Sequence, residues 1–124
     1  MSQKKILIVD DDADIRLGLS VRLRASKFVT VFAADGISAI AAAQRERPDL
    51  ILLDLGLPGG DGFLVLQRIG AIPRLASIPV IVVTARDPAT SEARALELGA
   101  RRLLQKPVDN EVLMAAIAEM VGDP

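Results

Sequence analysis

The sequence predicts a doubly wound α/β domain, in which a five-stranded parallel sheet carries helices on both faces. Short apolar runs alternate with longer amphipathic stretches along the whole chain. Three of these runs are continuous, which is typical of strands buried on both faces of a parallel sheet. The repeated alternation of strand and helix implies right-handed crossovers between parallel strands.

Five segments are the expected strands. The continuous runs contain only Ile, Leu and Val, at Ile6–Val9, Leu50–Leu53 and Val80–Val83. Phe28–Ala33 and Leu103–Gln105 give weaker strand signals. In the flavodoxin-like (βα)5 arrangement the strand order is 2-1-3-4-5, so the first and third strands are neighbours.

The first helix follows the first strand. Ile15, Leu19 and Leu23 recur at every fourth position and predict its buried stripe. Asp12 and Asp14 are expected to cap this helix and to complement its dipole. The basic side chains between the apolar ones are expected to point away from the core: Arg16, Arg22 and Arg24.

The other four helices follow from their end signals. An alanine-rich helix is expected over 38–47, ending before Pro48, and a short one over 62–69. Asp87 and Pro88 read as a helix start, with Gly99 as its stop. The last helix is expected to begin near Asp109, and its apolar stripe is Val112, Leu113, Ala116, Ile117 and Met120. We expect the tail, residues 122–124, to be frayed.

Composition excludes several classes of function. The chain has 124 residues, which fits one domain. It has no Cys and no His, which removes disulfides, thiolate metal sites and imidazole general bases. Fifteen basic and 16 acidic residues give a net charge of -1, and aromatics are 2%, so a nucleic-acid surface is not expected.

The chain also carries no membrane signal. No apolar run approaches the 18 or so residues that a spanning helix needs. The first ten residues hold two lysines but too short an apolar stretch for a signal peptide. We therefore expect a cytoplasmic protein, or one domain of a longer chain.

Acidic residues gather where two expected strands end. Asp10, Asp11 and Asp12 follow the first strand, and Asp54 follows the third. Ligands of open α/β sheets bind outside the carboxyl ends of the strands, so Asp10, Asp11 and Asp54 should share one pocket. Because neighbouring carboxylates repel, a hard cation with oxygen ligands would offset the cost, and Mg²⁺ fits that role.

Two other acidic motifs fail on comparison. A calcium EF-hand loop starting at Asp10 would need glycine where Ile15 stands and glutamate where Val21 stands. The aspartyl phosphatases with a D-x-D-x-T motif would need threonine where Arg16 stands.

Further residues surround the expected pocket. Thr84 ends the fourth strand, and Lys106 follows the fifth strand and precedes Pro107. The stretch DLGLPGGDG, residues 54–62, predicts a turn-rich loop that could direct a backbone carbonyl to a metal, and it contains Pro58, Gly59, Gly60 and Gly62.

Taken together, these motifs resemble a two-component response-regulator receiver domain. The resemblance rests on Asp10-Asp11, Asp54, the LPGGDG loop, Thr84-Ala85 and Lys106-Pro107, and it covers Lys4 to Val121. Each motif is weak alone, but five in order at the ends of the right strands are specific.

The resemblance implies a role for each matching residue. Asp54 would be the phosphoacceptor. Asp11, Asp54 and the Gly56 carbonyl would ligate Mg²⁺ or Mn²⁺, and Asp10 would act through a water. The phosphoryl group would meet Thr84, Ala85 and Lys106, and a cis bond would precede Pro107.

The resemblance also implies partners. A histidine kinase or a histidine phosphotransfer protein would donate the phosphoryl group. An effector would bind the face formed by the fourth helix, fifth strand and fifth helix. The chain would catalyse only its own phosphorylation and dephosphorylation, as a single receiver domain over 1–124 with no output domain in this chain.

The chain departs from the family pattern at two places: the first leaves an alternative function open, and the second argues against dimerisation of the kind seen in the DNA-binding subfamily. Leu103 stands where the family usually has Tyr or Phe, so a ring cannot rotate there. Arg101 and Arg102 stand where the DNA-binding subfamily has an acidic pair. The alternative is a phosphorylation-independent pseudo-receiver, which acts only as an interaction module. A phosphatase acting on free substrates ranks below both.

Overall fold

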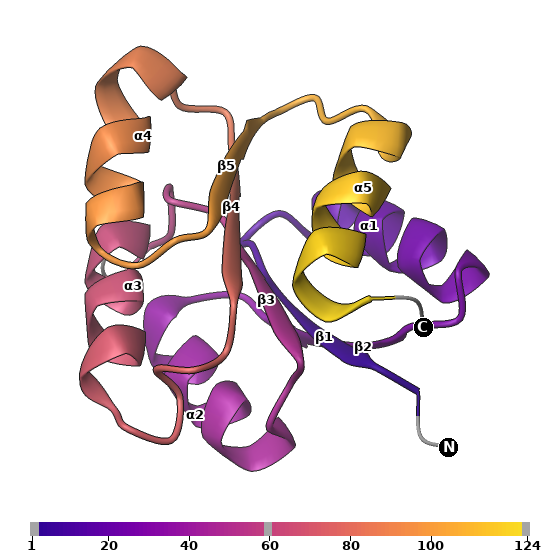
Figure 1. The fold of residues 1–124 in the computed structure, drawn as a ribbon, viewed down its shortest axis with the longest axis horizontal. Helices are drawn as coiled ribbons and strands as arrows, with labels where there is room; N and C mark the ends of the chain where they lie inside the picture. Colours follow the sequence, from indigo (N-terminus) through magenta and orange to yellow (C-terminus); the bar gives the residue numbers. More distant parts are fainter. Residues whose placement is uncertain (1–2, 59–60, 123–124) are drawn as a thin grey trace.

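The computed structural model describes residues 3–58 and 61–122, and it forms a three-layer α/β fold. Five parallel strands lie in the order β2-β1-β3-β4-β5, as predicted. Figure 1 shows the sheet between two helical layers, with α2, α3 and α4 on one side and α1 and α5 on the other. The strands are β1 (Lys5–Val9), β2 (Val29–Ala33), β3 (Leu50–Leu53), β4 (Val80–Thr84) and β5 (Arg102–Gln105).

Three helices begin at the predicted caps. Asp12, Asp87 and Asp109 are N-caps, and each accepts hydrogen bonds from backbone N–H groups of the following turn. Asp14 lies inside the first turn, where its charge complements the helix dipole. The helices are α1 (Ala13–Ala25), α2 (Gly36–Glu46), α3 (Gly62–Ala71), α4 (Pro88–Glu97) and α5 (Asn110–Val121).

Helix boundaries differ from the sequence prediction by a turn or less. The second helix starts at Gly36, two residues early, because Asp35 accepts a hydrogen bond from the Ser38 N–H and so caps it. It ends at Glu46, since Arg47 adopts a left-handed conformation before Pro48. Gly99, the predicted stop of the fourth helix, has φ 110°, which favours glycine.

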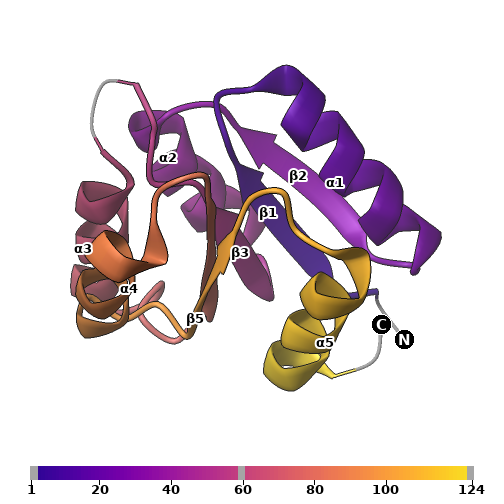
Figure 2. The ribbon, with the colours of Figure 1, turned by 90° about the horizontal axis from the view of Figure 1, so that it is seen from above.

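The two faces of the sheet bury separate apolar clusters. Alternate residues of the central strands point to opposite faces, so Leu7 and Val9 pack under α2 and α3 while Ile6 and Ile8 pack under α1 and α5. Figure 2 shows the same two layers from above. All residues from Ile6 to Val9 are at most 1% exposed, which explains their unbroken apolar sequence.

One predicted core position is wrong. Val112 was expected in the buried stripe of the last helix, but it is 46% exposed. Leu113, Ala116 and Ile117 are buried, and Met120 packs partly against them. Val112 lies at the edge of the stripe, beside the fully buried Leu113, so its side chain faces solvent.

Within residues 3–58 and 61–122, no helix has the length and apolar character needed to cross a membrane. Gly59, Gly60 and the last two residues of the tail lie outside the described residues.

Candidate functional site

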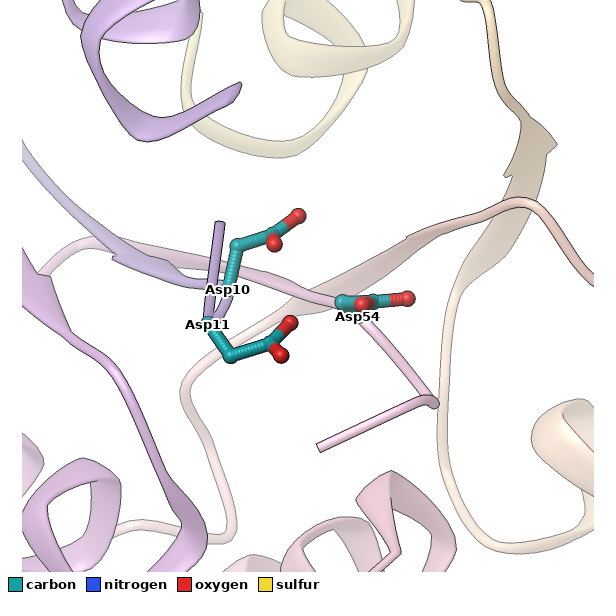
Figure 3. Close-up of side chains that lie close together, drawn as sticks. All are labelled: Asp10, Asp11 and Asp54. Atoms are coloured by element: carbon teal, nitrogen blue, oxygen red, sulfur yellow. The ribbon is translucent and has the colours of Figure 1, made fainter. Parts of the chain in front are cut away.

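The predicted acidic pocket forms at the carboxyl ends of β1 and β3. These strands pair in register with Val9 opposite Leu53, and Asp10 and Asp54 each follow by one residue. The Asp54 N–H donates to the Val9 carbonyl at 2.9 Å. One carboxylate oxygen from each of Asp10, Asp11 and Asp54 lies within 4.8 Å of the others. Figure 3 shows the three carboxylates projecting to the same side.

Asp10 is buried and held by three donors. Its side chain accepts a hydrogen bond from the Asp12 N–H at Oδ1, at 2.9 Å, and from Lys106 Nζ at Oδ2, at 2.6 Å. Its backbone carbonyl accepts from Arg16 Nη1 at 2.7 Å. The residue is only 3% exposed, so these donors replace the water that its carboxylate has lost.

Asp54 is enclosed but still reachable. Its side chain keeps 11% of its surface in contact with solvent. Lys106 Nζ lies 3.7 Å from Asp54 Oδ2, so one ammonium group serves two carboxylates. Its shorter contact is with Asp10. Lysine therefore neutralises part of the charge of the pocket and leaves the Asp54 carboxylate without a close hydrogen-bonded partner among the described residues.

Asp11 is the exposed member of the group. Within residues 3–58 and 61–122, no hydrogen bond or ion pair engages its side chain. The three carboxylates and one ammonium leave an excess of negative charge at a site whose ligands are all oxygen atoms, and this donor set suits Mg²⁺ or Mn²⁺. Gly56 lies beside Asp54, because a Cβ on it would be 3.7 Å from Asp54 Oδ2. The direction of its carbonyl stays a prediction.

Thr84 and Lys106 lie at the same edge of the sheet. Thr84 ends β4, is 1% exposed, and accepts a hydrogen bond from the Arg86 N–H at Oγ1, at 3.3 Å. The Lys106 N–H donates to the Thr84 carbonyl at 2.8 Å, which ties the end of β5 to the end of β4. The Lys106–Pro107 peptide bond is cis, as expected. Ala85 is exposed beside them.

A comparison with protein-family models identifies the family of this domain. Residues 6–118 match the model of the response regulator receiver domain. The chain belongs to this family. Its sequence relatives include the response regulator PleD of Caulobacter vibrioides, 40% identical over 117 residues, and the protein PilH of Pseudomonas aeruginosa, 35% identical over 113 residues.

The relatives differ in length. The chain spans 26% of PleD but 93% of PilH, while the matches cover 94% and 91% of the chain itself. It also spans 48% of RpaA of Synechocystis, a DNA-binding transcriptional regulator that is 38% identical. Receiver domains like this one therefore occur both in short proteins and in longer regulators.

Solved structures agree with this family. A CheY-like receiver domain protein from Methanospirillum hungatei has a TM-score of 0.90 at 28% identity, with 97% of this chain and 94% of that chain covered. The receiver domain of the sensor histidine kinase PA1611 from Pseudomonas aeruginosa has a TM-score of 0.89 at 29% identity, covering 98% and 100%. That structure has a magnesium ion coordinated in its active-site cleft.

Gly62 packs the start of the third helix of the receiver domain against the backbone of Asp54. Its N–H donates to the Leu55 carbonyl at 2.8 Å. A Cβ on Gly62 would lie 2.4 Å from the Asp54 carbonyl oxygen and 2.5 Å from Leu55 Cα. Only glycine permits this approach, so the start of α3 packs directly on the backbone that carries Asp54.

Phe63 extends this contact to α4. The ring is 4% exposed, and the Arg94 guanidinium lies 4.2 Å from its centre. Arg86, from the loop after Thr84, lies 5.6 Å from the same ring. Both contacts are cation–π interactions. The β4–α4 loop and α4 therefore meet on one side chain that follows directly after Gly62.

Leu103, which replaces the usual aromatic residue, is packed in the core. It is 7% exposed and belongs to the apolar cluster under α2, α3 and α4. Next to it, Arg102 pairs with Glu119 of α5 at 3.0 Å, across a largely exposed contact of little energetic weight. Arg101 is exposed.

Sequence reasoning missed one residue of the site. Arg16 was expected to point away from the core with the polar side of α1, but its guanidinium bends back to the Asp10 carbonyl. Its position one turn into a helix that follows an acidic run is the only signal in the sequence. The sequence did not predict either that Lys106 lies closer to Asp10 than to Asp54.

A groove runs beside the site between α1 and the β5–α5 loop. It has a volume of about 420 Å³. Its walls are largely apolar, with Ile15, Leu19, Pro107 and Val108 among the lining residues, and Lys106 lies at its edge.

Proposed function

We propose that this receiver domain is a phosphorylation-dependent signalling switch in which Asp54 accepts a phosphoryl group. The observation that supports this most directly is the environment of the Asp54 carboxylate. It lies beside two further carboxylates and an ammonium group, and it keeps a solvent-facing surface. Asp11, Asp54 and the Gly56 carbonyl would hold Mg²⁺ or Mn²⁺, which when bound supplies positive charge to the phosphoryl oxygens.

The proposed transfer step is an in-line displacement at phosphorus. An Asp54 oxygen attacks phosphorus and forms a P–O bond, while the P–N bond to the donor imidazole breaks opposite to it. The bonding electron pair returns to the imidazole nitrogen. Lys106, 3.7 Å from Asp54 Oδ2, is placed to meet a phosphoryl oxygen. Water later hydrolyses the acyl phosphate and restores the Asp54 carboxylate. In this proposal the domain catalyses only its own phosphorylation and dephosphorylation, with small phosphodonors as its only free substrates.

The proposed donor is a phosphohistidine outside residues 1–124, because these residues contain no histidine. The groove beside Lys106 offers a largely apolar surface next to the site, and a helix of a histidine kinase or phosphotransfer protein is its proposed partner. Ile15→Glu places a charge in this groove. It should slow transfer from a phosphohistidine donor but leave labelling by acetyl phosphate unchanged.

The output is proposed to pass through Thr84. Once the phosphoryl group is present, the Thr84 hydroxyl turns toward one of its oxygens and lengthens the 3.3 Å contact with the Arg86 N–H. The loop then moves relative to Phe63, and α4 follows. This biases the face formed by α4, β5 and α5 toward the form that an effector in the cytoplasm recognises.

The central test is chemical labelling. Acetyl phosphate with Mg²⁺ should produce a hydroxylamine-sensitive acyl phosphate on the wild-type protein, resolved on a phosphate-affinity gel. Asp54→Asn should abolish it. Asp87→Asn is the matched control, since Asp87 caps α4 at the same edge of the sheet and asparagine also caps well. Full labelling of Asp54→Asn would refute the assignment of the acceptor.

The pseudo-receiver remains a second candidate because Leu103 is already packed inward. An aromatic residue that moves between two positions is absent here. Beryllofluoride with Mg²⁺ separates the two candidates. A switch should change the amide spectrum around Thr84 and α4, whereas an interaction module that does not use phosphorylation should show changes at Asp54 and its direct neighbours alone.

A further inference from the structure

The loop that carries the acidic residues is fixed by more contacts than capping requires. After β1 ends at Val9, Asp10 offers three oxygen atoms, and each accepts a hydrogen bond from a different donor. Two of these donors act on the carboxylate. The third, Arg16 Nη1, acts on the backbone carbonyl at 2.7 Å. This carbonyl belongs to the peptide bond that joins Asp10 to Asp11.

Arg16 therefore controls the peptide plane from which Asp11 projects. Its own backbone N–H donates to the Asp12 carbonyl at 3.0 Å. Arg16 therefore makes hydrogen bonds to both residues that flank Asp11 in the chain. Asp11 itself is exposed and makes no side-chain contact within the described residues. Its direction is set by the backbone alone.

We infer that Arg16 is a positioning residue for the divalent ion, acting through the Asp10–Asp11 peptide. This inference rests on the proposed function, since it assumes that Asp11 is a ligand of Mg²⁺. Residues that hold metal ligands in place typically change metal affinity by about 10- to 100-fold when they are lost.

Charge and position predict opposite results, which makes the inference testable. Arg16 is a cation near a site for another cation, so its removal should strengthen Mg²⁺ binding if charge alone mattered. If its hydrogen bond positions Asp11, removal should weaken binding. We expect Arg16→Met to raise the Kd for Mg²⁺ by roughly tenfold.

Arg22 provides the matched control. It lies on the same helix, and its guanidinium also donates to a backbone carbonyl, that of Val108 at 3.2 Å. Arg22→Met removes the same charge and the same kind of contact but does not touch Asp10. Its Kd for Mg²⁺ should stay within about twofold of the wild type. Arg16→Lys, which keeps the charge and a donor, should recover most of the affinity.

The experiment is a titration of each variant with MgCl₂ by calorimetry, with amide spectra to confirm the fold. Arg16→Gln replaces Arg16→Met if the latter does not fold. A second measurement uses acetyl phosphate: the labelling rate at saturating Mg²⁺ should be near that of the wild type, while the Mg²⁺ concentration for half-maximal rate rises. A general structural defect would also lower the labelling rate at saturating Mg²⁺.

Each outcome decides the inference. Unchanged or tighter binding in Arg16→Met overturns it, as does an equal loss in Arg22→Met. Because binding is measured without phosphorylation, a wild-type protein that binds Mg²⁺ but is never labelled would refute the proposed function and leave the test of Arg16 intact. A wild-type protein that binds no Mg²⁺ would overturn both.

Discussion

Replacing Gly62 with alanine should destabilise the domain, although alanine is the better helix former. Gly62 is the first residue of α3, and alanine is favoured over glycine inside helices by up to about 1 kcal/mol. Against this gain stands a new Cβ atom 2.4 Å from the Asp54 carbonyl oxygen and 2.5 Å from Leu55 Cα. An ordinary carbon–oxygen contact is about 3.3–3.6 Å, so the backbones must separate by roughly 1 Å.

The magnitude follows from what that separation disrupts. Overpacking of this kind costs about 1–3 kcal/mol. The displacement also strains the 2.8 Å hydrogen bond from the Gly62 N–H to the Leu55 carbonyl, which contributes about 1 kcal/mol. After the helix gain is subtracted, we expect a net loss of about 2 kcal/mol. The same shift moves the backbone of Asp54, so labelling by acetyl phosphate should also slow.

Two other glycines of the helices serve as controls. Gly70 lies near the end of the same helix, and a Cβ there would come no closer than 3.9 Å to the Leu98 carbonyl oxygen. Gly18 lies in the middle of α1 with nothing within 4 Å. Both alanine variants should gain stability, by about 0.5–1 kcal/mol, because only the helix preference changes.

The assay is urea unfolding followed by circular dichroism, since the chain has no Trp or Tyr for fluorescence. With a slope of about 2 kcal/mol per molar urea, the midpoint of Gly62→Ala should fall by about 1 M. The midpoints of the two controls should rise. A Gly62→Ala protein as stable as the wild type would show that α3 does not press on the acceptor backbone as described, and the reasoning would fail.

Three further predictions concern charge. Mg²⁺ at a hundredfold excess over its Kd should stabilise the wild type by about 2.7 kcal/mol, which is roughly 10 °C in Tm by calorimetry. Asp11→Asn should lose most of this shift in Tm. Equal shifts in the two proteins would exclude Asp11 as a ligand. Without Mg²⁺, Lys106→Met should lower the free energy of unfolding by about 3 kcal/mol in urea, because it leaves the buried Asp10 carboxylate without its cation. The same variant should bind Mg²⁺ more tightly in calorimetry. An unchanged free energy of unfolding would contradict the pairing of Lys106 with Asp10. Hydrogen bonds from the Ser38 backbone and side chain lower the pKa of Asp35, so its contribution to capping α2 is present above the ordinary carboxyl range and lost as pH falls through the lowered pKa. Ser38→Ala should raise that pKa part of the way back, as followed by the carboxyl carbon resonance in NMR, and no change would mean that the backbone N–H acts alone.

The sequence best predicts those segments of the fold in which every residue is buried. Ile6–Val9 has no exposed face, so its composition reports its place in the sheet directly. Caps are equally local, since Asp87 must accept from the turn that follows it. Val112 could not be placed this way, because its exposure depends on the orientation in which α5 packs on the sheet.

The same distinction holds for the site. The meeting of Asp10, Asp11 and Asp54 follows from strand order, because parallel strands bring their carboxyl ends to one edge. The partner of a long flexible side chain does not follow from order. Lys106 Nζ has two carboxylates nearby, at 2.6 and 3.7 Å, and Arg16 Nη1 meets a backbone carbonyl instead of a carboxylate, so only the three-dimensional path of the loops decides which contact forms.

The parallel sheet also places the proposed phosphoryl chemistry at one edge of the molecule, the carboxyl ends of the strands, and leaves the opposite edge free of it. All residues assigned to phosphoryl chemistry lie at the carboxyl ends of the strands, so the connection from α3 to β4, residues 72–79, lies at the opposite rim. Ala76 and Ser77 are exposed there. A fluorescent reporter inserted between them would sit a full strand length from the acceptor, and the domain could be built into a sensor without altering the chemistry it is meant to record.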